Sequence, residues 1–364
     1  MNSDDCVTMS LIEHIQSRLG MYVPTDDGKP TKAVWDMLLY ELTAFGVRAF
    51  SRGEARRIEI DYNHETGMLS INHEDPCADN FALVSKALDS VSEELGALCR
   101  DRAAQEACYT RYCEMIFPIV NALSAKLVVE AFHDGEWTAV ICRNGNVGPI
   151  ERLVPELADS SWRHHFCIRF KIDPRYLPED ETGPYAEEGL QDFGDGLACT
   201  HPGLCVVVNG SEHLHLRGMV DFVADRLGGD HEGILMEPKT FHCGDVSFSC
   251  GARKRKDVAR RIFSQVFING RRVQSTAILA MFSELVCDWI GDARKFQNGG
   301  YELVFAVSGI FPYDVKDFSD LDRTLYLSNG ALRDTGAFRD ITMLSHLVST
   351  VKRCMIDAFA GIQR

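Results

Sequence analysis

The fold is decided by one stretch near the N-terminus, Trp35-Asp-Met-Leu-Leu-Tyr-Glu-Leu-Thr-Ala-Phe-Gly-Val-Arg-Ala-Phe50. It completes a run from Lys32 that is apolar on most sides, which predicts a long helix buried in the protein. Glu41 lies among these apolar residues, and Phe45 follows it one helical turn later. A carboxylate buried there needs a partner or takes up a proton. Glu41 is therefore interpreted either as a paired structural residue or as a general base.

The composition is that of a globular protein without a strong attraction to nucleic acid. The chain has 364 residues, of which 45% are apolar and 25% are charged, and this length is enough for two domains. The net charge of −15 argues against DNA as a partner, because the phosphate backbone attracts clustered Lys and Arg. The one basic run, Arg253-Lys-Arg-Lys256 followed by Arg260 and Arg261, is interpreted as a solvated hairpin or helix start.

Targeting signals and cysteine usage point to the cytoplasm. No apolar run is long enough to span a membrane, and the acidic N-terminus lacks the apolar core of a signal peptide. The 13 cysteines are expected to be mostly small buried hydrophobes rather than disulfide partners. A zinc site at Cys199, His201 and Cys205, or at His213 and His215, is the disfavoured alternative because the ligand spacing is wrong. We expect no metal site and no cofactor.

The order of predicted elements indicates an α/β sandwich followed by a second α/β domain. The helix from Lys32 to Phe50 precedes a hairpin and two helices, and four strands come next. These elements are Arg57 to Tyr62 with Met68 to Asn72, Phe81 to Gln105, Tyr109 to Ser124, Lys126 to His133, Glu136 to Arg143, His165 to Ile172 and Leu204 to Asn209. The helix Val220 to Leu227 leads to a strand–strand–helix–strand–helix unit: Asp245 to Gly251, Ser264 to Asn269, Ser275 to Ile290, Glu302 to Gly309 and Ile341 to Phe359.

Several segments, taken in order, resemble the gyrase B / topoisomerase IV B-subunit family. They are Ile12-Glu-His-Ile-Gln-Ser-Arg-Leu-Gly-Met-Tyr-Val23, the helix with Tyr40-Glu41, Val120-Asn-Ala-Leu-Ser-Ala-Lys-Leu127 and Arg217-Gly-Met-Val-Asp-Phe-Val223. The resemblance implies an α+β fold: a Bergerat-type (GHKL) ATPase sandwich over residues 1–220, then a ribosomal-S5-like transducer domain over 221–364. It also implies that Glu41 occupies the position of the glutamate that activates the water attacking ATP.

The magnesium and adenine positions of that family are altered here. Phe45 stands where the family has the asparagine that holds Mg²⁺. The segment Ile71-Asn-His-Glu-Asp-Pro-Cys77 replaces the family's D-D-G-x-G, so that His73 takes the place of the aspartate that binds adenine. A proline also removes a backbone donor from this segment.

The phosphate positions of the family are altered too. Arg111-Tyr-Cys-Glu-Met-Ile116 replaces a glycine-rich lid, whose amides converge on phosphates because no side chains intervene. His165 and Phe166 replace a Gly-Thr pair that contacts adenine, and Arg323 replaces the lysine that meets the γ-phosphate. The resemblance therefore implies a degenerate member of the family, a pseudo-ATPase.

Three functions remain open from the sequence. The first is a binding or regulatory module that acts on a protein partner or as a homodimer. The second is a repurposed enzyme with Glu41 as acid or base on a small molecule. Its ligand-binding pocket would be formed by His73, Glu74, Asp75, His164, His165, Arg169 and Arg323. The third is a divergent topoisomerase-type ATPase. The sequence leaves open whether Phe45 and Phe166 fill that pocket, as two phenyl rings can do.

Overall fold

The computed structural model describes residues 9–74, 78–94, 114–133, 136–153, 165–177, 184–228, 234–243, 246–255, 262–268, 271–272 and 300–308. They divide into two units. Unit 1 contains the described residues up to Leu190 together with Leu204–Glu212, and unit 2 contains Gln191–Gly203 with those from His213 onward. Cys199 belongs to unit 2, where it packs into the hydrophobic core.

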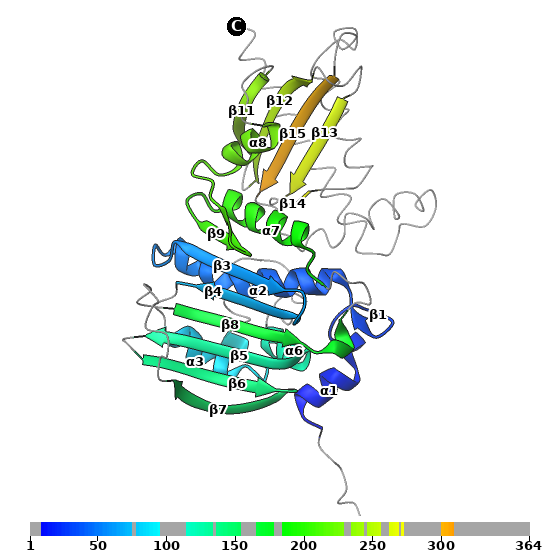
Figure 1. Cartoon of the computed structure of the whole chain (residues 1–364), viewed down its shortest axis with the longest axis vertical. Coiled ribbons are helices and arrows are strands. Elements are labelled where there is room, and N and C mark those ends of the chain that lie inside the picture. The colour runs from blue at the N-terminus through cyan, green and yellow to red at the C-terminus, as the bar shows by residue number, and fades with distance from the viewer. Residues whose placement is uncertain are drawn as a thin grey trace, which may run out of the picture. The chain divides into compact units, whose positions relative to one another are not determined.

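Unit 1 is built on an eight-stranded mixed sheet (Figure 1). The strand order is β10-β9-β3-β4-β8-β5-β6-β7, in which β3 pairs with β4 in antiparallel and with β9 in parallel orientation. The strands are β3 (Arg57–Asn63), β4 (Met68–His73), β5 (Ser124–His133), β6 (Glu136–Arg143), β7 (Asn146–Leu153), β8 (His165–Ile172), β9 (Cys205–Val208) and β10 (Ser211–His213).

Helices cover one face of this sheet. In Figure 1, α2 (Lys32–Ser51), α3 (Ala78–Lys86) and α6 (Ile116–Ala122) lie behind the strands. The strand residues that face them alternate with polar ones, as the two-residue period of a strand requires; Ile58 and Ile60 on β3 and Ile71 on β4 are fully buried. Gly46 lets α2 approach closely, because a Cβ there would lie 2.8 Å from Cδ1 of Ile58 and 2.9 Å from Cβ of His73.

The N-terminal helix begins with a capping box. In α1 (Leu11–Ser17), the Glu13 amide donates to Oγ of Ser10 at 3.2 Å, and the Ser10 amide donates to Oε2 of Glu13 at 2.8 Å. The remaining short elements of unit 1 are η1 (Leu19–Met21), β1 (Thr25–Asp26), β2 (Lys29–Pro30) and η2 (Pro174–Tyr176).

Unit 2 is a five-stranded sheet with α8 (Met219–Leu227) packed on it. The strand order is β11-β12-β15-β13-β14, in which β13 and β15 are parallel and so require a crossover connection. The strands are β11 (Ile234–Cys243), β12 (Val246–Arg255), β13 (Ile262–Ile268), β14 (Arg271–Arg272) and β15 (Gly300–Ser308). Its core holds Cys199, Met219, Phe222, Val223, Leu227, Phe267, Val304 and Ala306.

Antiparallel hairpin pairs occur in both sheets. Ile268 on β13 pairs with Arg271 on β14. Between β6 and β7, Asn144 and Gly145 both have positive φ, 49° and 87°, as a type I′ turn requires. The strand that follows was not predicted. It contains Pro149, but it is an edge strand, where a proline interrupts no internal ladder.

Other expectations need correction. The helix predicted over Phe81 to Gln105 is interrupted, because α3 ends at Lys86 and both Ala87 and Leu88 are buried outside it. Residues 95–105 of that prediction lie outside the described residues. Helix α7 (Glu187–Thr200) and strand β11 were not predicted at all. The helices expected over Ser275 to Ile290 and Ile341 to Phe359 lie outside the described residues. Within the described part of the chain, no helix combines the length and the apolar character needed to cross a bilayer.

Candidate functional site at helix α2

Helix α2 carries the residues that the sequence singled out first. Glu41 and Phe45 lie one turn apart, and their exposed fractions are only 5% and 3%. The helix is buried on most sides because it lies against β3 and β4 of the sheet and against α6. Both side chains are therefore enclosed by protein rather than displayed on a surface.

The ring of Phe45 stands at the centre of an aromatic cluster. Its centroid lies 6.0 Å from that of Phe117 on α6 and 5.8 Å from that of Phe166 on β8. The guanidinium of Arg48 lies 4.5 Å from the centre of the same ring, within the range of a cation–π contact. Phe117 and Phe166 are both fully buried. Phe45 thus joins α2, α6 and β8 through core packing.

His73, at the end of β4, is part of the same buried layer. Its exposed fraction is 0%, and its ring centroid lies 5.1 Å from that of Phe166. Burial, with the nearby His165 and Arg48 contributing, lowers the pKa of His73 to about 3, so the ring is neutral at physiological pH. Neither ring nitrogen has a hydrogen-bond partner among the described residues. His73 is thus a buried residue and not part of an exposed turn.

His165 and Arg169 are not brought to this layer. Successive residues of a strand point to opposite faces, and in β8 it is Phe166, Ile168 and Phe170 that face the helices. His165 and Arg169 lie on the other face. There Arg169 pairs with Glu130, and the ring of His165 meets that of Trp137 edge-on at 5.3 Å.

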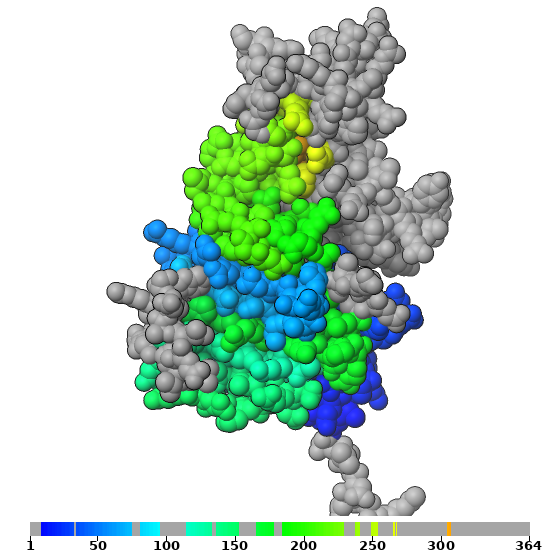
Figure 2. All heavy atoms as spheres, viewed as in Figure 1, coloured from blue at the N-terminus to red at the C-terminus, as the bar shows by residue number. Residues whose placement is uncertain are grey.

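That opposite face reaches solvent over part of its area. The side chain of Arg169 is 44% exposed, and the space-filling view shows atoms of the blue and cyan-green strands at the surface on this side (Figure 2). Burial nevertheless lowers the pKa of His165 to about 4; the charge of Glu59 opposes this shift and that of Arg169 adds to it. The resemblance placed these residues in one pocket with Glu41, whereas the structure separates them by the thickness of the sheet.

The remaining predicted site residues divide between a structural role and the part of the chain that is not described. Glu74 accepts a hydrogen bond from the Arg56 amide at 2.7 Å, which ties the start of β3 to the end of β4. Asp75, His164 and Arg323 lie outside the described residues.

The described cysteines are mostly buried thiols. Among the described cysteines, Cys142, Cys167, Cys199 and Cys250 are buried and free, as expected of small hydrophobes. Burial raises the pKa of the Cys142, Cys167 and Cys250 thiols to about 12, which makes them unreactive. The described residues hold no group of three His, Cys, Asp or Glu side chains placed to bind a metal ion.

No family model matches the chain, and no curated protein matches it. Solved structures are similar. The B-subunit of DNA gyrase from Myxococcus xanthus is 19% identical with a TM-score of 0.54, and the match covers 82% of this chain and 86% of that one. This chain has the fold of a gyrase B ATPase domain. The match shows the fold alone, because identity this low does not carry function.

Two further solved structures are less similar. The 43K ATPase domain of Thermus thermophilus gyrase B in complex with an aminocoumarin has 17% identity and a TM-score of 0.47, over 82% of this chain and 81% of that one. The topoisomerase IV ATP-binding domain of Francisella tularensis in complex with a small-molecule inhibitor has 14% identity and a TM-score of 0.45. This match covers 96% of this chain and 98% of that one.

The layer between α2 and the sheet combines a neutral imidazole with three phenyl rings. Glu41 is buried on α2 one helical turn before Phe45. Sequence reasoning missed Arg48, although its position three residues after Phe45 puts both on one helix face. It also missed Asp195 on α7 and Arg226 on α8, which form a polar cluster with His215. The available signal for that cluster was the His213-Leu-His215 spacing.

Proposed function

We propose that this protein is a binding or regulatory module built on a gyrase-B-like fold that has lost the ATP and magnesium site. Phe45 is the observation that carries the proposal. Mg²⁺ takes oxygen ligands, and a phenyl ring has none to offer. The ring is also packed between Phe117 and Phe166, so it supports the core at the position where the resemblance implies a metal ligand.

The chemistry of His73 supports the same proposal. The family's aspartate accepts a hydrogen bond from the amino group of adenine, whereas a neutral imidazole has a single acceptor nitrogen and no charge. The ring is held between Gly46 and Phe166 without exposed surface. A nucleotide could enter only if these side chains moved. In this proposal the protein acts on another protein or on a second copy of itself, and light scattering of the purified chain distinguishes the two.

The proposal predicts that Mg²⁺-ATP leaves the melting temperature unchanged. A ligand that binds only the native state stabilises it by about 2.7 kcal/mol at a hundredfold excess over Kd, which differential scanning fluorimetry detects readily. We expect no shift with ATP or with a non-hydrolysable analogue, each with and without Mg²⁺. A magnesium-dependent rise would overturn the proposal in favour of a divergent ATPase. Phe45→Asn is the matched variant, because it restores an amide where the resemblance implies one.

A second candidate function is favoured by one observation: both ring nitrogens of the buried His73 lack a hydrogen-bond partner among the described residues. A buried polar group without a hydrogen bond costs on the order of 1–3 kcal/mol, and such costs are concentrated at functional sites. A small uncharged molecule that supplies a donor or an acceptor to His73, close to helix α2 with Glu41, would remove that cost. This layer would then serve a repurposed enzyme with Glu41 as acid or base.

This second candidate predicts small molecules that stabilise the wild-type chain and not His73→Phe. Screening a fragment library by thermal shift measures both proteins side by side, and Glu41→Gln then tests turnover of any hit. Equal shifts in wild type and His73→Phe would place binding elsewhere. The absence of any hit would leave the module as the better proposal.

A further inference from the structure

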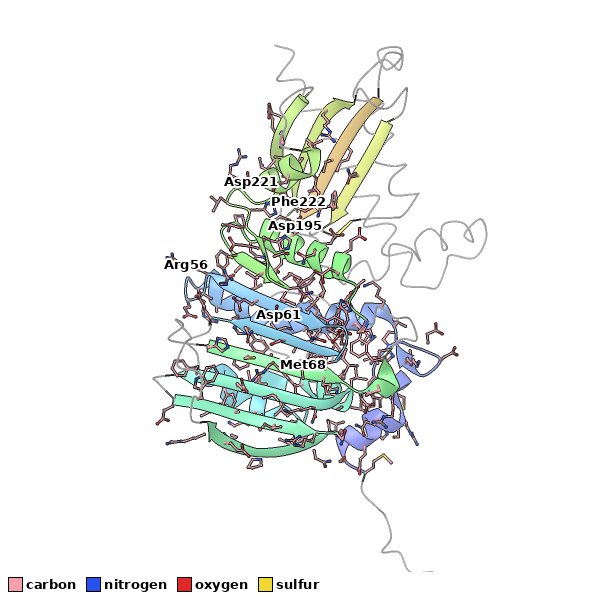
Figure 3. The ribbon with its side chains drawn as sticks, viewed as in Figure 1. Arg56, Asp61, Met68, Asp195, Asp221 and Phe222 are labelled. Atoms are coloured by element: carbon pink, nitrogen blue, oxygen red, sulfur yellow. The ribbon has the colours of Figure 1, made fainter. Side chains whose placement is uncertain are left out.

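Unit 2 contains a second polar cluster, which joins three segments distant in the sequence. Asp195 on α7 lies at its centre. Its carboxylate accepts hydrogen bonds from Nε2 of His215 at 2.5 Å and from the guanidinium of Arg226 at 2.9 Å. His215 lies just after β10, and Arg226 belongs to α8. Figure 3 labels Asp195 on α7, with Asp221 and Phe222 on α8.

The centre of the cluster is largely removed from solvent, whereas the side chain of Asp225 is mostly exposed. The side chain of His215 is 4% exposed and that of Asp195 16%. Arg226 also binds Asp192 at 3.1 Å, and its guanidinium lies over the ring of Phe222. Burial by itself raises the pKa of the Asp195 carboxyl, but hydrogen bonds from two histidines and the charge of Arg226 outweigh it, and the pKa is lowered. Asp195 is therefore an anion in the folded protein.

His215 faces a carboxylate oxygen with each of its ring nitrogens. Nε2 lies 2.5 Å from Oδ1 of Asp195, and Nδ1 lies 3.6 Å from Oδ2 of Asp225. A neutral imidazole carries one N–H, and the carboxylate of Asp195 can only accept, so that hydrogen is on Nε2. Nδ1 then presents a lone pair toward a second carboxylate, and this buried atom has no hydrogen-bond partner in the described part of the chain. A proton on Nδ1 gives this atom a hydrogen to donate and replaces the repulsion between its lone pair and the carboxylate by attraction.

His213, the last residue of β10, repeats this arrangement. Its Nε2 lies 2.7 Å from Oε1 of Gln191, and its Nδ1 lies 3.6 Å from Oδ1 of Asp195. Both of its ring nitrogens thus face oxygen acceptors as well. Unit 2 consists of two chain segments, and Gln191 and His213 are the first residues of these segments.

The charges around His215 favour proton uptake. Among the described residues, the groups that face it are the carboxylates of α7 and α8, the Arg217–Asp221 ion pair, His213 and the guanidinium of Arg226; the carboxylates are Asp192, Asp195 and Asp225. Three carboxylates against one unshared cation leave a negative surplus. The pKa of Asp225 is raised, first by burial and then by Asp195 and Asp221, although His215 opposes the shift.

We propose that His215 is a proton-operated latch between α7 and α8 in unit 2. Uptake of a proton ties Asp195 and Asp225 to one imidazolium, and its release frees the α8 end of the contact. Because the latch needs the protonated ring, it is closed at lower pH and opens at higher pH. Helix α8 packs on β11, β12 and β15, so the latch controls how firmly this helix covers the second sheet.

Hydrogen exchange of the full chain at pH 6 and pH 8 tests the latch. After correction for intrinsic exchange rates, the amides of Met219–Leu227 are expected to be protected more strongly at pH 6. If opening of the latch releases one proton, protection falls by at most roughly tenfold for each pH unit. Asp225→Asn keeps the size of the side chain but removes the second carboxylate, and it should abolish the difference. His64→Gln, at an exposed histidine of unit 1, should preserve it.

A second measurement keeps the inference falsifiable if Asp225→Asn fails to fold. The ¹⁵N shifts of the wild-type imidazoles report directly which nitrogens carry hydrogen. At pH 6 we expect both nitrogens of His215 to be protonated. A ring with one bare nitrogen at pH 6, or α8 protection that is independent of pH, would overturn the latch.

Discussion

Acid is expected to destabilise this protein through His73, and His73→Phe should remove about half of the loss between pH 4.5 and pH 8. The ordinary pKa of histidine, 6.5, applies in the unfolded chain, whereas burial holds the folded value at about 3. Between these values the unfolded chain binds a proton that the folded chain does not. The free energy of unfolding is therefore unaffected by His73 above about pH 6.5, and it decreases as pH falls from there toward 3.

The size of this effect follows from the gap between the two pKa values. Each unit corresponds to about 1.36 kcal/mol, so His73 accounts for a loss of about 2 kcal/mol at pH 5 and on the order of 5 kcal/mol near pH 3. Chemical denaturation followed by circular dichroism, at pH values between 4.5 and 8, measures the slope. His64→Gln serves as the matched control, because it removes an exposed imidazole from the same unit.

Parallel slopes for wild type and His73→Phe would contradict this account. A residual slope is expected in the variant, because burial also lowers the pKa of His165, to about 4. Between pH 4.5 and 8 both histidines lie above their folded pKa values, so their contributions have the same slope and the variant is expected to keep about half of the wild-type slope.

Phe45→Ala is expected to cost about 3–5 kcal/mol of the free energy of unfolding. The ring is buried, with Phe117 and Phe166 at 6.0 and 5.8 Å, so its removal leaves a cavity that this close-packed layer can fill only in part. Phe45→Leu retains most of the apolar volume and should cost less than about 1.5 kcal/mol. Urea unfolding of the three proteins measures both differences.

The Phe45 series also separates a packed core from an open site. In an open ligand pocket, the ring would border empty space, and its truncation would cost little stability. A loss below about 1 kcal/mol in Phe45→Ala would therefore show that this layer is loosely packed and would weaken the proposed loss of the nucleotide site. A large loss would agree with a phenyl ring that has become part of the structure.

The sequence by itself determined the features that depend on neighbouring residues. The capping box at Ser10 and Glu13, the Asn-Gly turn at Asn144 and the buried helix around Glu41 all follow from local hydrogen bonding, backbone sterics or apolar content. The ordered segments similar to gyrase B likewise indicated the fold that the Myxococcus xanthus structure shares.

The tertiary structure alone decided which of the candidate residues meet. Strand register places Phe166 opposite His73 on the helix-covered face, and the same register sends His165 and Arg169 to the other face. A resemblance of motifs gives the order of residues but not this alternation, in which one position changes the face. The contacts of Asp195 with His215 and Arg226 likewise join residues 20 and 31 positions apart, and no local pattern encodes such a distance.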